Sequence, residues 1–100
     1  MDKLEIKGGA RIAIANASYP FATLLVNKDC LELKVSILAD LKFKTSEVLS
    51  IEPHRSFPFR TKGVKINHTN PNINKKVIFW TFTASAKIIS QIKEIGFLNH

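Results

Sequence analysis

Cysteine is nearly absent from this sequence, and so are the signals of secretion and membrane insertion. Cys30 is the only cysteine, which excludes a disulfide within the chain and suits a reducing compartment. No apolar run reaches the ~18 residues that a membrane-spanning helix requires. The first residues, 1–7, interleave charged and apolar side chains and lack the apolar run of a secretion signal. We therefore expect a cytoplasmic protein.

Motifs for catalysis and for cofactor or metal binding are also missing. Gly8 and Gly9 lack a following Lys-Ser/Thr pair and precede a strand-like segment, so they do not form a phosphate-binding loop. Cys30 has no catalytic motif around it, and a small structural thiol is the simpler interpretation. The spacing of the three histidines, His54, His68 and His100, is not that of metal ligands. We expect no catalytic residue, cofactor, metal or small-molecule substrate, and therefore no enzyme.

The composition is that of one soluble globular domain covering residues 1–100. Hydrophobic residues make up 45% of the chain and charged residues 23%, with seven Phe, one Tyr and one Trp. Such a chain is too apolar for disorder. A domain of this length buries roughly 60–70% of the surface of its unfolded form, which is enough for one core. No repeat or flexible linker interrupts the sequence, and we expect the ordered core to span about residues 10–97.

Most of the chain shows short apolar runs with the period-two spacing of β-strands. The segment 30–35 alternates most clearly and predicts a core face of Leu31, Leu33 and Val35. Because the segment 53–62 holds two prolines and two phenylalanines, we expect it to be irregular or to lie at a sheet edge. The predicted strands are 11–15, 21–26, 30–35, 41–44, 46–54, 64–67 and 77–82.

The pattern becomes helical after Thr83. An apolar stripe at helical spacing, Ile88, Ile89, Ile92 and Ile95, predicts one amphipathic helix at about 84–95. Thr83 or Ser85 is the predicted N-cap. Gly96 stands where a left-handed residue ends many helices.

The order of these elements resembles that of the pleckstrin-homology-like (PH-like) superfold. The segments 20–26 and 75–82, the second followed by a helix, look like those of small bacterial PH-like domains. The resemblance implies a bent sandwich or open barrel of about seven antiparallel strands, capped by the helix, with a binding or scaffolding role. Another small β-barrel with a terminal helix, or an α+β roll, has similar content. The basic lipid-binding motif of the family has no counterpart in the nearly neutral turns at 16–18 and 27–29, so no family residue is transferred.

Positive charge is concentrated in the second half of the chain. Residues 1–52 hold seven basic and seven acidic residues, whereas residues 53–100 hold eight basic residues and one acid, Glu94. This asymmetry indicates either an anionic partner or charge that only keeps the protein in solution. If the loops around 54–62 and 68–76 lie at one end of the sheet, they form a cationic rim. The candidate anion-binding residues are Arg55, Arg60, Lys62, Lys65, Lys75 and Lys76, with Phe57 and Phe59 as candidate interface residues or as caps of the core.

A binding or scaffolding role therefore remains as the predicted function. The first expectation is protein–protein interaction or self-assembly, because the strand at 77–82 is apolar on both faces and sheet edges accept partner strands. The alternative is peripheral binding to an anionic membrane surface through residues 54–76. Nucleic acid is disfavoured because arginine, the side chain best suited to phosphate and base contacts, is scarce. For Trp80 we expect a place in the core.

Overall fold

The computed structural model of this chain describes residues 2–36, 39–56 and 61–98. For residues 55, 56 and 61 it describes the backbone but not the side chains. Within these residues the chain forms seven strands, a short 3-10 helix (η1, Thr45–Glu47) and one α-helix. The strands are β1 (Lys3–Ile12), β2 (Ala15–Asn27), β3 (Cys30–Val35), β4 (Ala39–Lys44), β5 (Val48–Ser56), β6 (Thr61–His68) and β7 (Val77–Thr81), and the helix is α1 (Ser85–Ile95).

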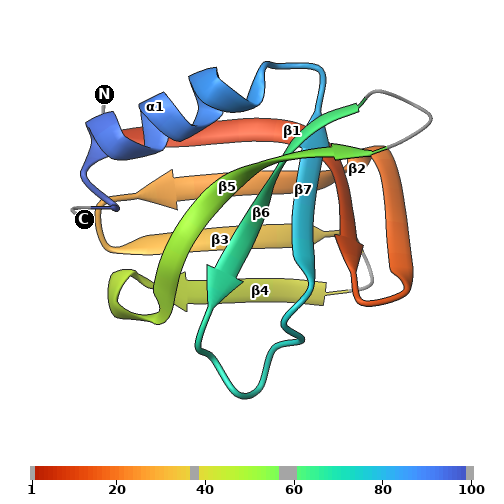
Figure 1. The fold of residues 1–100 in the computed structure, drawn as a ribbon, viewed down its shortest axis with the longest axis horizontal. Coiled ribbons are helices and arrows are strands. Elements are labelled where there is room, and N and C mark those ends of the chain that lie inside the picture. Colours follow the sequence, from red (N-terminus) through yellow and green to blue (C-terminus); the bar gives the residue numbers. More distant parts are fainter. Residues whose placement is uncertain (1, 37–38, 57–60, 99–100) are drawn as a thin grey trace.

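All seven strands belong to one antiparallel sheet in the order β4-β3-β2-β1-β7-β6-β5. Because β1 pairs with both β2 and β7, it joins the first four strands to the last three. The sheet curls into a half-barrel, and Figure 1 shows β5, β6 and β7 crossing in front of β2, β3 and β4. The predicted fold class, mainly β with about seven antiparallel strands and a C-terminal helix, is confirmed.

A single hydrophobic core fills the inside of the curled sheet. In β3 the side chains of Leu31, Leu33 and Val35 are buried while Lys34 is exposed, as the alternation predicts. Burial of each such side chain contributes about 1.5–3 kcal/mol. The largest fully buried side chains include Phe43, Phe79, Phe97, Leu24, Leu31, Leu33, Ile66, Ile88 and Ile92.

The helix α1 packs one apolar face on this core. Its buried residues are Ile88, Ile92 and Ile95, all from the predicted stripe, and Figure 1 shows the helix along one end of the sheet. Gly96 ends the helix with φ 95°, and its N–H donates to the Lys93 carbonyl at 3.1 Å. The predicted N-cap was wrong. The N-cap is Ala84, whose methyl side chain cannot accept a hydrogen bond. Ser85 is the first helical residue, and its Oγ donates to the Gly63 carbonyl at 2.7 Å.

The first strand differs from the prediction of 11–15. The chain turns at Ala13 and Ile14, and Ala13 takes a left-handed φ of 56°. Because the apolar alternation continues through residues 13 and 14, the sequence pattern gives no sign of this turn. A bulge follows in β2, since Gly8 pairs with Ala22 but Ala10 pairs with Ala17. Residues 18–21 therefore lie opposite Gly9 alone.

For the segment 53–62 the sequence predicted either an irregular region or a sheet edge. The described part of the segment is regular strand. β5 continues to Ser56, β6 begins at Thr61, and these two residues pair with each other. The edge expectation holds for residues 53–56, because β5 is the last strand in the sheet order, but residues 61 and 62 belong to β6, which lies between β5 and β7. Pro53 lies in this edge strand, where proline is tolerated because only one side of the strand carries ladder hydrogen bonds. Residues 57–60 lie outside the described residues.

Candidate functional site

A basic groove of about 250 Å³ lies on the outer face of the last three strands. It is lined by His54, Lys65, Lys75, Lys76 and Ile78. Three of the predicted anion-binding residues, the lysines, therefore meet around one hollow. Ile78 is almost fully buried there, which gives the groove an apolar floor and cationic walls.

Strand alternation places Lys65 in the groove. Its neighbours in β6, Val64 and Ile66, are buried in the core, so Lys65 projects from the opposite face. Lys65 lies opposite Ile78 of β7 in the register. Ile78 in turn lies opposite Arg11 of β1, which is exposed. Arg11 and Lys65 therefore flank the floor residue from the two neighbouring strands.

The loop before β7 places Lys75 and Lys76, and His68 organises this loop. The Nδ1 of His68 accepts from the Asn70 N–H at 3.1 Å, and its Nε2 lies 2.8 Å from the Asn74 carbonyl oxygen. These contacts fit the tautomer with the proton on Nε2. The Asn74 Oδ1 accepts from the Lys76 N–H at 2.8 Å. The backbone carrying Lys76 is thereby fixed.

The β1–β2 turn lies directly beside the groove. The Ala13 N–H donates to the Lys76 carbonyl at 3.0 Å. The next residue, Ile14, is 92% exposed. An aliphatic side chain almost entirely in solvent thus lies in the turn whose backbone contacts Lys76, and Arg11 lies near the end of the preceding strand. The sequence analysis missed Arg11 and Ile14, because only the pairing of β1 with β7 brings the turn to the second half of the chain.

The remaining predicted residues do not join this groove. Lys62 lies opposite Thr81, about 10 Å along β6 from Lys65. Arg55 pairs with Lys62 through its backbone. Lys62 lies near the first residue of β6, whereas the loop with Lys75 and Lys76 follows its last residue, so these lysines form no single rim. Arg60, Phe57 and Phe59 lie outside the described residues.

The groove carries little compensating negative charge. The closest acid in the register is Glu52, which lies opposite Lys65 in β5. Among the residues that the structure describes, the ion pair present is that of Lys34 with Glu32 at 4.0 Å, on another strand. Glu52 therefore offsets part of the charge of Lys65, while no acid lies opposite Lys75 or Lys76 in the register of the described strands.

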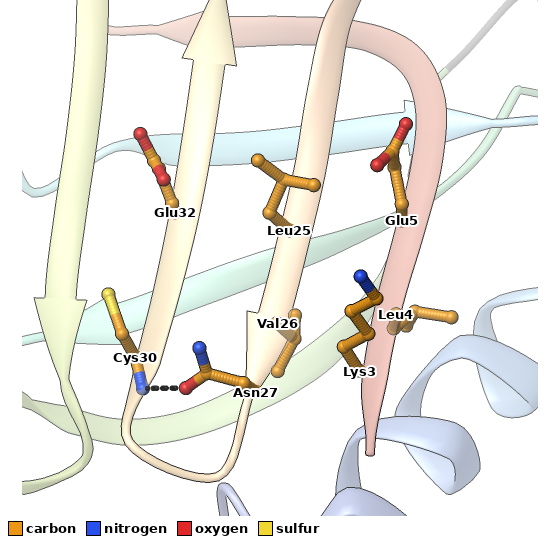
Figure 2. A pocket seen from close by; sticks show the side chains of 8 residues that line it. All are labelled: Lys3, Leu4, Glu5, Leu25, Val26, Asn27, Cys30 and Glu32. Carbon is orange, nitrogen blue, oxygen red and sulfur yellow. Dashed lines mark hydrogen bonds between the residues drawn. The ribbon is translucent and has the colours of Figure 1, made fainter. Parts of the chain in front are cut away.

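A second hollow, of about 240 Å³, lies over β1, β2 and β3 (Figure 2). It contains the only thiol, and the Cys30 N–H donates to the Asn27 Oδ1 at 2.8 Å. Burial, followed by the nearby charge of Glu32, raises the pKa of the Cys30 thiol. A raised pKa favours the unreactive thiol over the nucleophilic thiolate. The lining residues are Lys3, Leu4, Glu5, Leu25, Val26, Asn27, Cys30 and Glu32.

Trp80 and its neighbours form a further surface feature. Trp80 is half-buried and not in the core, contrary to the expectation, because residue 80 alternates to the outer face of β7. Near it, the rings of Tyr19 and Phe82 pack edge to face with their centroids 5.1 Å apart. The sequence gives no signal for this contact, which joins β2 to the end of β7.

Within the described ranges 2–36, 39–56 and 61–98, no helix combines the length and apolarity needed to cross a membrane. The same residues contain no group of three or more His, Cys, Asp or Glu side chains arranged to hold a metal ion. Comparison of the sequence with models of protein families and with curated proteins gives no match.

Proposed function

We propose that this chain is a non-enzymatic, PH-like binding module that attaches to anionic membrane surfaces through the basic groove and the β1–β2 turn. The observation that carries the proposal is the position of Ile14. This aliphatic side chain is 92% exposed, and it directly follows Ala13, whose N–H donates to the Lys76 carbonyl. An exposed apolar residue next to cations fits a lipid interface, where the side chain enters the acyl boundary and the cations face the headgroups.

The PH-like part of the proposal rests on topology. Seven antiparallel strands curl into a half-barrel, and one helix follows the last strand. This is the order of elements that the resemblance implies. The raised pKa of the Cys30 thiol disfavours a nucleophilic role for this one side chain. A cytoplasmic location belongs to the same proposal, and a free cysteine suits it.

Charge supplies most of the attraction in this arrangement. Each Lys or Arg near an anionic surface contributes about 1 kcal/mol. Lys65, Lys75, Lys76 and Arg11 together therefore contribute on the order of 4 kcal/mol, before Ile14 adds its apolar term. The attraction falls off within about 8 Å at physiological ionic strength, so binding weakens steeply with added salt.

Vesicle flotation tests the proposal. The purified protein is mixed with vesicles of phosphatidylcholine alone, or of phosphatidylcholine with phosphatidylglycerol, at physiological salt. We expect flotation with the anionic vesicles only. The triple variant Lys65→Ser, Lys75→Ser, Lys76→Ser is expected to stay in the bottom fraction, and Ile14→Asn to float less.

The matched control is Lys28→Ser, Lys44→Ser, Lys87→Ser, which removes the same charge from exposed sites outside the groove. It is expected to float almost as well as the wild type. Equal losses in the two triple variants would show that net charge alone is responsible, and would overturn the role of the groove. Absence of wild-type flotation with anionic vesicles would overturn membrane binding itself.

A further inference from the structure

Three aromatic side chains are exposed at the corner where β2 bulges and β7 ends. Phe82 is 70% exposed, Phe21 59% and Tyr19 44%. Tyr19 and Phe82 pack against each other with an interplanar angle of 60°. We call these three residues the aromatic corner. Exposed apolar groups gathered in one place mark interaction surfaces more often than single ones do.

The backbone presents these rings in fixed positions. Tyr19 and Phe21 belong to the bulge at 18–21, which stands opposite Gly9. The residue before Phe82 is anchored, because the Thr81 Oγ1 donates to the Lys7 carbonyl at 3.0 Å. Aromatic rings held in this way lose little conformational entropy on binding. For that reason Tyr and other aromatics dominate many protein interfaces.

The corner is separate from the basic groove. The floor of the groove, Ile78, lies near the start of β7, whereas Phe82 follows its last residue. Four residues of extended strand span about 13 Å. A ligand on one surface therefore leaves the other accessible.

The charges around the aromatic corner are positive. Lys7 lies on β1 opposite Thr23, and Lys62 lies on β6 opposite Thr81, and both lysines are exposed. The sequence contains no acidic residue between Glu5 and Asp29, or between Glu52 and Glu94. The segments 7–27 and 61–82 are therefore free of acids, and the nearest acid along β1 is Glu5, two residues before Lys7. The net charge of +7 also opposes close approach of a second copy of this chain.

We infer that the aromatic corner docks an acidic segment of a different protein. An apolar or aromatic side chain of that segment packs on Phe82 and Tyr19, and its flanking Asp or Glu residues face Lys7 and Lys62. The lysines steer the encounter and set the orientation, and the rings supply the contact area. This inference goes beyond membrane binding and does not depend on it.

Peptide titration followed by NMR tests the inference. The 15N-labelled protein is titrated with a synthetic peptide in which Phe and Leu are flanked by Glu residues. We expect amide shifts confined to residues 18–23 and 80–83 and to the neighbourhoods of Lys7 and Lys62. Phe82→Ser is expected to weaken binding by about tenfold or more, as truncation of a central aromatic residue does at other interfaces. Lys7→Glu combined with Lys62→Glu is expected to abolish binding.

Two controls make the outcomes distinct. Ile14→Ser removes an apolar side chain that is even more exposed than Phe82 and lies in the β1–β2 turn, and it is expected to leave peptide affinity unchanged while lowering vesicle flotation. A peptide of Glu and Ser without apolar residues is expected to bind much more weakly. Binding that survives Phe82→Ser, shifts that cluster at Lys65 and Lys76, or equal binding of the Glu-Ser peptide would each overturn the inference. Sedimentation showing a dimer that Phe82→Ser dissociates would assign the corner to a second copy and would also overturn it.

Discussion

Gly9 and Trp80 pair directly across β1 and β7, and the indole ring occupies the space that a side chain at residue 9 would need. A Cβ on Gly9 would overlap the Cε2 and Cζ2 atoms of Trp80. It would also lie 2.6 Å from the carbonyl oxygen of Ala17. The strand that joins the two halves of the sheet therefore depends on a glycine under the only tryptophan.

Gly9→Ala is expected to destabilise the fold by about 1–3 kcal/mol and to displace the indole, because the overlap includes backbone that cannot move freely. Urea unfolding measures the first effect and tryptophan emission the second. Gly96→Ala is the control. It places alanine at φ 95° in open space, so it should cost stability without changing the emission. Unchanged emission and stability in Gly9→Ala would contradict the packing.

The sequence predicts those elements whose pattern is local. β3 has the predicted bounds because its core and solvent sides alternate strictly, and α1 is almost as predicted because four isoleucines mark one face. The turn at Ala13 is not predictable from alternation, since the apolar pattern runs through a left-handed residue. The corner of Tyr19 and Phe82 was likewise missed, because a bulge and a strand end far apart in the sequence create it.

The candidate site was predictable in part. Lys65, Lys75 and Lys76 were identified by charge, and the fold gathers them in one groove. The predicted single rim required Lys62 to lie close to Lys75 and Lys76, but Lys62 lies at the start of β6 and the other two lysines follow its end. Charge patterning therefore identified the residues but not which of them share a surface.

Ile92→Asp is expected to unfold the domain. Ile92 is fully buried on the core-facing side of α1, within the hydrophobic core, so a carboxylate there would lose its hydration among apolar side chains. Circular dichroism melting measures the effect. Ser90→Asp adds the same charge to an exposed position of the same helix, and it is expected to melt close to the wild type. An unchanged melt in Ile92→Asp would contradict the packing of the helix on the sheet.

His68→Ala is expected to loosen the loop that carries Lys75 and Lys76. The substitution removes two contacts to the loop and the packing of the imidazole on Phe43, whose ring centroid lies 4.7 Å away. We expect a loss of about 1–3 kcal/mol in unfolding free energy together with weaker vesicle binding.

His54→Ala provides the contrast for His68→Ala. His54 lines the same groove but makes no side-chain hydrogen bond within the described part of the chain. This variant is expected to keep its stability. Thermal melting and flotation of both variants check the distinction, and equal stability of the two would argue against an organising role for His68.

Glu32→Gln is expected to stabilise the protein near neutral pH but not in acid. A hydrogen bond with Asp40, followed by burial, raises the pKa of the Glu32 carboxyl from its ordinary 4.5, and this outweighs the attraction of Lys34 and Lys42. The folded state therefore holds this proton more tightly than the unfolded state does. The stabilisation from this group is complete below the ordinary pKa and is lost as the pH rises through the raised one.

Glutamine stays neutral at every pH, so the variant should melt higher than the wild type at pH 7. The gain should stay below about 1 kcal/mol, because the pair lies near solvent, and it should vanish toward about pH 4. Asp40→Asn removes the same repulsion, so combining it with Glu32→Gln should add little. A lower melting temperature for Glu32→Gln at pH 7 would mean that the attraction of Lys34 and Lys42 for the ionised carboxylate dominates instead.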